Sequence, residues 1–311
     1  MSFALPEPMI SLRPVIELRD AASLANATDV IATFPAPVSA DLGHSLPGRL
    51  RGALGEALLS GRARPTSVAV SRRRRLYAHR GAFEQLFEGA SSPLSGCSPA
   101  QRIPPYTVAS EVSCGRVVAR IRLFGRAGFH APEVAEAFYY ALVTNGVSLA
   151  PLARSRFRVA KSSLNLDLAA VKPTPLAVLS SGTVRMVTLS PFYVSRGKAI
   201  AADAAAIIGS GLMRASGLLA WCGFHLQVDT QAFSYARRQI RGVNSTLSVS
   251  EKWHRVSRRR RQVVELFGMR GGISLAGLND EVRQLLPLIE MVQLGQRTTA
   301  GFGCVCFFHE T

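Results

Sequence analysis

Acidic residues are scarce in this chain. Of its 311 residues only 20 are Asp or Glu, against 37 Lys or Arg, and the formal net charge at pH 7 is +17. Lysine is scarce as well, because four of the 37 basic residues are lysine and the other 33 are arginine. A genome rich in G and C favours Arg over Lys, but it does not explain the missing acids. The charge balance therefore predicts a polyanionic partner, and the guanidinium group is suited to phosphate and to stacking on bases.

The sequence also shows no paired cysteines, and we expect neither a membrane span nor a signal peptide. Its five cysteines are scattered and form no Cys-x-x-Cys motif, so we expect a reducing cytoplasm and no structural zinc, metal or other cofactor. The longest apolar candidate, Ala199 to Gly223, is interrupted by Asp203, Arg214 and four glycines, which is typical of a buried or amphipathic helix. The N-terminus has neither a basic start nor an apolar core. An anionic membrane is a weaker partner than a nucleic acid, since no amphipathic terminal anchor accompanies the charge.

A Gly-rich segment, Leu294 to Gly303, stands near the C-terminus. It lies between the end of an expected amphipathic helix, Leu285 to Val292, and an apolar strand, Cys304 to Phe308. Glycine permits positive φ and a close approach of the backbone to a ligand. Successive N–H groups in such a turn can hold an anion, and Arg297 adds a planar phosphate donor. Taken alone, the motif is more often a plain tight connection.

The first half of the chain predicts strands and helices in alternation. Leucines recur at every fourth position from Leu46 to Leu58, which predicts a helix. Residues Val117 to Gly125 predict a strand with Arg120 and Arg122 on one face, and Pro132 to Asn145 predicts a second helix. We expect an earlier strand within residues 10–18 and a chain break at residues 34–37.

The same pattern restarts in the second half. Residues 166–182 contain two prolines and predict a linker, which divides the chain into domains of residues 1–165 and 183–311. A strand from Thr183 to Pro191 and a long helix from Ala201 to Trp221 follow. We therefore predict an α+β protein with two βαββαβ halves in tandem.

Arginines gather in two runs of four, Arg72–Arg75 and Arg258–Arg261. The first run is either a solvated loop or a phosphate contact. The second forms, with Arg237, Arg238 and Arg241, a group of seven arginines that we expect in an Arg-rich helical insertion of the second domain. Such a helix could contact a structured RNA, which is read largely through phosphates and 2′-hydroxyls. A solvated basic helix without a partner is the alternative.

Four stretches, in this order and spacing, match the pattern of a known superfamily. They are Leu46–Gly55 as a first-helix motif, Val187–Pro191 as the strand that opens a second domain, Trp253–Arg261 followed by Gly271-Gly272, and Leu294–Gly303 as a signature Gly-rich loop. Each is weak alone, but together they span nearly the whole chain and resemble the CRISPR-associated RAMP superfamily. The chain is most similar to the precursor-crRNA processing endoribonucleases of that superfamily. Its Arg content suggests a divergent branch, such as that of a type IV system.

The resemblance implies two ferredoxin-like domains side by side, with a CRISPR repeat stem-loop lying across a basic face between them. It implies a single cut in precursor crRNA, made without metal by the 2′-hydroxyl upstream of the scissile phosphate. The products would be a 5′-hydroxyl and a 2′,3′-cyclic phosphate. Further expected partners are the mature crRNA, which the enzyme would retain, and other subunits of a CRISPR ribonucleoprotein complex.

The resemblance also suggests site residues. His44 comes directly before the first predicted helix, where many relatives place a catalytic histidine, and it could act as acid or base. Arg49 and Arg51 could stabilise charge on the phosphorane. An exposed loop histidine is an equally good interpretation of His44, some relatives use no histidine, and His254 is the second candidate. The RNA-binding candidates are Arg72, Arg73, Arg74, Arg75, Arg237, Arg238, Arg241, Arg258, Arg259, Arg260, Arg261, Gly295, Arg297, Thr298, Gly301 and Gly303.

Other functions stay open. A non-catalytic guide-RNA-binding subunit of a CRISPR effector complex would share the fold, the charge and the Gly-rich loop. A ribosomal or other structured-RNA-binding protein is a further alternative, although the order of the motifs disfavours it. A metal-dependent nuclease is poorly supported, because no paired acidic motif stands out.

Overall fold

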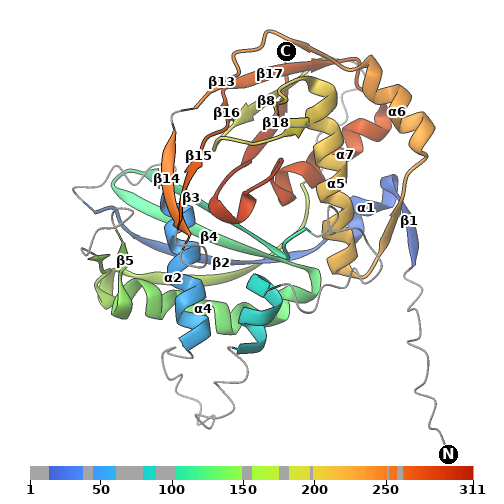
Figure 1. Cartoon of the computed structure of the whole chain (residues 1–311). Helices are drawn as coiled ribbons and strands as arrows, with labels where there is room; N and C mark the ends of the chain where they lie inside the picture. Colours follow the sequence, from blue (N-terminus) through green and yellow to red (C-terminus); the bar gives the residue numbers. More distant parts are fainter. Residues whose placement is uncertain are drawn as a thin grey trace, which may run out of the picture.

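Two α+β halves lie against each other in the computed structural model of the chain (Figure 1). The structure describes residues 14–37, 45–60, 80–88, 103–148, 156–174, 182–196, 199–250, 252–257 and 262–310. Each half contains one four-stranded sheet, and helices cover one of its faces.

The first sheet is antiparallel throughout. Its strands in spatial order are β3 (Tyr106–Ser113), β4 (Arg116–Phe124), β2 (Ala27–Pro35) and β7 (Asn165–Val171). Helix α2 (Leu46–Ser60) follows the first of these strands in the chain, β2, and α4 (Ala131–Tyr139) follows the third, β4. The first half therefore has the βαββαβ order.

The second sheet repeats this order. Its strands in spatial order are β12 (Arg241–Val243), β17 (Gly272–Ala276), β8 (Val184–Thr188) and β18 (Val305–His309). Helix α5 (Ala204–Cys222) follows β8, and α7 (Asp280–Val292) follows β17. The predicted α+β class and the two βαββαβ halves are confirmed.

Shorter elements connect these. They are β1 (Val15–Glu17), α1 (Leu18–Leu24), η2 (Glu84–Glu88), η4 (Gly125–His130), η5 (Tyr140–Asn145), β5 (Val147–Ser148), β6 (Arg156–Phe157), η6 (Lys161–Ser163), β9 (Ser195–Arg196), β10 (Ala199–Ile200), β11 (His225–Gln227), α6 (Thr230–Gln239), β13 (Ser248–Val249), β14 (Trp253–Ser257), β15 (Gln262–Leu266), β16 (Met269–Arg270) and η7 (Thr298–Ala300).

The apolar periodicity of the sequence explains how the first core forms. All four leucines of the α2 stripe, from Leu46 to Leu58, are fully buried against the first sheet. In β4 the alternate residues Val117, Ala119 and Ile121 are buried, and the arginines between them face the other side of the sheet. Both patterns follow from the geometry of helix and strand, which repeat about every 3.6 and 2 residues.

Helix α5 is the core helix of the second half. By length and composition it could cross a membrane, but 56% of its apolar window is buried inside the molecule. It packs against α7 and contributes Ile207, Leu218 and Trp221 to the second core. The predicted buried helix is therefore confirmed.

The described N-terminal residues pack with the second half, not the first. Strand β1 pairs in parallel with β11, and Leu18 and Ala21 of α1 belong to the second core. The predicted first domain, residues 1–165, is thus corrected at its start. Sequence periodicity could not show this, because a three-residue strand carries almost no pattern.

The predicted linker is also corrected. Strand β7 pairs with β2 from Asn165 opposite Thr33 to Val171 opposite Ala27, so residues 166–171 are the fourth strand of the first sheet. The prolines at 173 and 175 indicate only where that strand has to end. Strand β2 itself was not predicted, and it extends to Pro35, within the expected chain break.

The residues on both sides of the second Arg run form strands and not the predicted helix. Strands β14 and β15 pair antiparallel from Trp253 opposite Leu266 to Ser257 opposite Gln262, which makes a hairpin of the residues on either side of it. The aromatic and β-branched residues of these segments favour strands. Residues 258–261 themselves are outside the described residues. Of the seven arginines in this group, Arg237 and Arg238 lie in helix α6.

A buried carboxylate joins the two halves. Asp29 of β2 accepts two hydrogen bonds from Arg122 of β4, at 2.7 and 2.8 Å, and forms an ion pair with Arg120 at 3.3 Å. Arg122 also donates from Nη1 to the carbonyl oxygen of Met291 in α7, at 3.2 Å. Asp29 therefore holds an arginine of the first sheet in place against the last turn of α7.

Substitution Asp29→Ala should destabilise the protein strongly. It leaves Arg122 partly buried without its carboxylate, and losing one partner of a buried pair costs about 3 to 5 kcal/mol. Urea unfolding measures the change. The matched control is Asp20→Ala in α1, whose carboxylate is exposed and whose loss should cost no more than about 1 kcal/mol. Equal effects of the two substitutions would contradict this account of the interface.

Candidate nucleic-acid interface

The Gly-rich loop, Leu294 to Gly303, connects α7 to β18. Its glycines at 295, 301 and 303 have φ values of 77°, 91° and 80°, and Arg297 has a φ of 64°. An L side chain is disfavoured in this left-handed region, whereas glycine is not. The predicted positive φ values are confirmed, and they turn the chain sharply around the short helix η7.

The backbone amides of the loop serve the protein at several positions. The N–H of Gln296 donates to the carbonyl of Tyr193, and that of Gly303 donates to the carbonyl of Pro191, both at 2.8 Å. The N–H of Gly301 closes the η7 turn. At these three positions the expected concavity of free amides is not formed. Side chains rather than amides are therefore the candidates for binding an anion here.

The loop packs against the start of α2. A Cβ atom added to Gly301 would overlap the ring of Pro47, and one added to Gly48 would lie 3.7 Å from the carbonyl oxygen of Ala300. The two stretches are far apart in the sequence, and glycines on both sides let their backbones come close. The loop therefore lies at the junction of the two halves.

Arg297 is held by aromatic rings. Its guanidinium carbon lies 4.3 Å from the ring centroid of Tyr193 and 6.0 Å from that of Phe302. Tyr193 also contacts Phe267 edge to face, at 6.0 Å. Phe302 and Tyr193 form a small apolar cluster with Leu266, the last residue of β15. The Gly-rich loop and the base of the β14–β15 hairpin therefore share one packing cluster.

A cleft of about 470 Å³ opens beside the loop. Helix α5, the loop and residues 103–104 before β3 form its walls, and α6 contributes Arg237. Gly295 and Thr298 of the loop line it as well. Among the described residues that line it, none is acidic and four are arginines, namely Arg196, Arg214, Arg237 and Arg297. This cleft concentrates positive charge next to the Gly-rich loop.

Arg214 binds the residues at which α7 ends and the Gly-rich loop begins. It is buried in α5 and donates from Nε and Nη2 to the carbonyl of Val292, at 3.0 and 2.6 Å, and from Nε to the carbonyl of Gln293, at 2.6 Å. Burial lowers the pKa of Arg214 to about 9, so the group remains a cation at pH 7. A cation at this position also favours the C-terminal end of the α7 dipole. Sequence reasoning missed this role, because the acceptors are backbone atoms of a distant helix.

The two predicted catalytic arginines lie in α2. His44 is outside the described residues. Arg49 donates from Nη1 to the carbonyl of Ser148 at 3.0 Å, and burial lowers its pKa. Arg51 donates from Nε to the hydroxyl of Tyr106 at 2.9 Å and lies 5.1 Å over the ring of Phe87. The two arginines therefore point to different protein partners.

The remaining candidates are spread over the second half. Arg238 in α6 and Arg241 at the start of β12 are exposed. His254 belongs to strand β14. Both Arg runs, residues 72–75 and 258–261, are outside the described residues. Of the predicted RNA-binding residues, the structure brings Arg237, Arg297, Gly295 and Thr298 together at the cleft.

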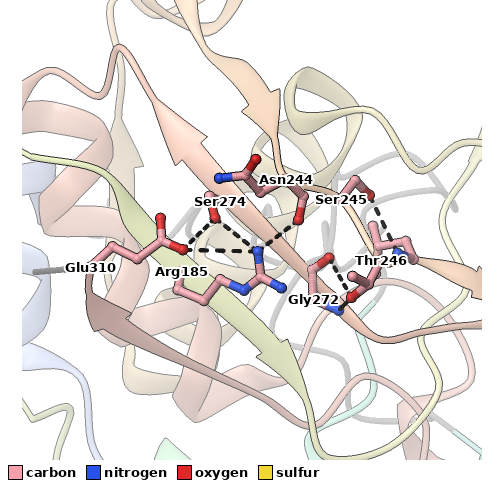
Figure 2. Close-up of polar contacts among 8 residues, drawn as sticks. Arg185, Asn244, Ser245, Thr246, Gly272, Ser274 and Glu310 are labelled. Carbon is pink, nitrogen blue, oxygen red and sulfur yellow. Dashed lines mark hydrogen bonds and ion pairs between the residues drawn. The ribbon is translucent and has the colours of Figure 1, made fainter.

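A polar network on the open face of the second sheet fixes the chain that leads to the hairpin. Figure 2 shows Arg185 donating to the carbonyl of Asn244 and to the hydroxyl of Ser274, at 2.7 and 2.8 Å. Ser274 donates to Glu310 at 2.8 Å, and the adjoining Thr246 exchanges hydrogen bonds with Gly272. The network ties the residues between β12 and β13 to the sheet. No local signal in the sequence could have predicted it.

Comparison with known proteins identifies the fold. No protein-family model and no curated protein matches the chain. Among solved structures, the product complex of Thermus thermophilus Cas6 (TTHB231) matches with a TM-score of 0.53 and 15% identity, over 91% of this chain and 99% of that one. A second Cas6 (TTHA0078) product complex matches with a TM-score of 0.50 and 15% identity, over 92% of this chain and 100% of that one. The chain therefore has the tandem ferredoxin-like fold of Cas6 proteins.

Substitution Gly301→Ala should destabilise the protein more than Gly115→Ala. Both glycines have left-handed φ values, of 91° and 70°, and an alanine in that region costs about 1 to 2 kcal/mol. Only Gly301 faces a neighbour, Pro47, and overpacking adds about 1 to 3 kcal/mol. Urea unfolding of both variants isolates the packing cost. Equal losses of stability would show that the junction tolerates a wider spacing.

Substitution Arg214→Met should leave the carbonyls at the end of α7 without donors. Each unsatisfied buried acceptor costs about 1 to 3 kcal/mol, so we expect a loss of about 3 kcal/mol in unfolding free energy. Hydrogen exchange of the amides in the Gly-rich loop should accelerate in the same variant. Arg116→Met, at an exposed position of β4, is the control. Unchanged exchange in the loop would mean that Arg214 does not hold it.

Proposed function

We propose that the chain is a metal-independent endoribonuclease that binds CRISPR repeat stem-loop RNA and cleaves precursor crRNA. The observation that carries the proposal is the match of more than nine tenths of the chain to Cas6 product complexes. The net charge of +17 and the arginine-lined cleft beside the Gly-rich loop support a polyanionic substrate.

The proposed reaction is a transesterification within the RNA. The 2′-hydroxyl upstream of the scissile phosphate attacks the phosphorus, and the bond from phosphorus to the 5′-oxygen of the next nucleotide breaks. A base takes the proton of the 2′-hydroxyl, and an acid gives a proton to the leaving oxygen. The products are a 2′,3′-cyclic phosphate and a 5′-hydroxyl.

His44 is the proposed acid or base of this reaction, since imidazole titrates near neutral pH. Arg49 is the arginine that we propose to stabilise the phosphorane. Its known hydrogen bond uses one of five N–H donors, and it ends on a carbonyl that leaves the charge of the guanidinium unneutralised. The arginines of the cleft would hold the product electrostatically, so that the mature crRNA stays bound within a larger complex.

The contacts of Arg51 favour a second function. The guanidinium donates to the buried Tyr106 and packs over Phe87, which is the environment of a structural arginine. A guide-RNA-binding subunit without nuclease activity needs only such structural contacts around α2. The assignment to a type IV system remains a prediction from the arginine content.

A cleavage assay in EDTA tests the proposal. Purified protein is incubated with labelled repeat RNA and with the same RNA carrying 2′-deoxy at the cut site. We expect cleavage of the first and none of the second, because the attacking hydroxyl is missing. His44→Ala should lower the single-turnover rate by about 100-fold or more, as general acid–base catalysis typically contributes 10² to 10⁴.

Substitution Arg49→Gln should lower the rate by at least about 10-fold, since removal of one donor to a developing oxyanion costs about 100-fold in well-studied cases. The matched control is Arg116→Gln, which removes an exposed arginine of β4 and should leave the rate within about twofold. Tight binding of the repeat with no cleavage at all would reject the nuclease and support the guide-RNA-binding subunit.

A further inference from the structure

Two arginines of the cleft have donors from which no described residue accepts a hydrogen bond. The Nε of Arg237 and the Nη1 of Arg297 are buried, and neither donates to an acceptor among the described residues. A buried donor without an acceptor costs about 1 to 3 kcal/mol, more when it is charged. Both side chains line the same cleft, so one ligand with several acceptor oxygens would satisfy both.

No carboxylate offsets this charge. In the part of the chain that the structure describes, neither Arg237 nor Arg297 takes part in an ion pair, and the cleft also includes Arg196 and Arg214. Four cations around one opening repel one another and attract an anion. Arginine binds phosphate in particular, through parallel N–H groups that match its oxygens.

The absence of a side chain at Gly209 makes room for Arg237. Gly209 lies inside α5, where alanine would be more favourable than glycine by about 1 kcal/mol. A Cβ atom there would lie 2.6 Å from Nη1 of Arg237 and 3.5 Å from its Cδ. The missing side chain therefore lets an arginine of α6 lie across α5 at the cleft.

The other walls of the cleft suit a sugar or a base. Ile103, Pro104 and Val194 present apolar surface, and the side chain of Met213, which is half exposed, lies beside them. Ser210 and Thr299 add hydroxyl groups. The volume of about 470 Å³ is within the range of small-ligand pockets and exceeds what a bare anion needs.

We propose that this cleft holds one nucleotide of a single-stranded segment of the bound RNA. Its phosphate lies between Arg237 and Arg297, and its sugar and base pack against Pro104 and Met213. This inference rests on the proposed RNA-binding function and adds a contact that is independent of the stem. Single-stranded RNA is commonly bound in this way, by a basic groove with a surface on which a base can pack.

The test compares two RNA ligands by fluorescence anisotropy, a short oligouridylate and a blunt repeat hairpin without single-stranded flanks. Gly209→Ala, Arg237→Gln and Arg297→Gln should each weaken oligouridylate binding about tenfold or more, the usual effect of losing a charge-assisted hydrogen bond. Hairpin binding should change by less than about threefold in Gly209→Ala, which keeps every charge, and in the two arginine variants it should weaken less than oligouridylate binding does.

Gly209→Ala is the sharpest variant, because it keeps every charge and only fills the space beside Arg237. Thermal unfolding should show that it is at least as stable as the parent protein. The matched control is Gly52→Ala in α2, where an added Cβ would meet no atom within 4 Å. Arg116→Gln controls for the loss of one positive charge.

The outcomes separate this inference from the proposed function. Oligouridylate affinity that is unchanged in all three variants would overturn the nucleotide site, even if the hairpin is bound and cut. Competition by inorganic phosphate as strong as by uridine monophosphate would overturn it as well, because the cleft would then bind only an anion. Oligouridylate binding that depends on Gly209 and Arg237, without any cleavage of repeat RNA, would support the site and reject the nuclease. Absence of any RNA binding would overturn both.

Discussion

The close contact between Gly301 and Pro47 determines how the two halves of the molecule meet. It brings the Gly-rich loop, near one end of the chain, onto the first turn of α2, near the other. The cleft beside the loop takes its walls from α5, from the loop and from the residues before β3, so it forms only when both halves are folded. A change that destabilises the junction should therefore also disrupt the basic cleft. Gly301 is needed because a side chain there would overlap Pro47 and push the halves apart, whereas side chains at Gly295 and Gly303 would meet the backbone of Tyr193 and Leu294.

A chain with few acids has to satisfy its arginines in another way. Here backbone carbonyls replace carboxylates as acceptors, at Ser148, Met291, Asn244, Val292, Gln293 and Gly182. A carbonyl accepts the hydrogen bond but leaves the positive charge in place. The structure thus stabilises its buried and half-buried arginines while keeping most of the net charge of +17 for a polyanion. Asp29 is the main exception, and it lies where a carboxylate has to bind two neighbouring arginines of β4.

How much of this could be predicted depended on the range of the interactions. The leucine stripe of α2, the alternation in β4 and the positive φ of the glycines are local, and each was predicted correctly. Strand β7 is an exposed edge strand whose place depends on pairing with β2, more than a hundred residues away. The cleft itself was not predicted; four of the predicted RNA-binding residues line it, and their role in binding stays a prediction. The roles of Arg214, Tyr193 and Gly209 were missed, since each depends on a contact with a distant element.

The packing cluster under the Gly-rich loop connects the β14–β15 hairpin to the cleft. Leu266 at the base of the β14–β15 hairpin packs with Phe302 of the loop, and the same cluster includes Tyr193, over which Arg297 lies. A displacement of the hairpin would therefore move the ring that supports Arg297 in the cleft. Because packed side chains transmit small shifts over short distances, a ligand that moves the hairpin and a nucleotide in the cleft should influence each other's affinity. By linkage, that influence has to be equal in both directions.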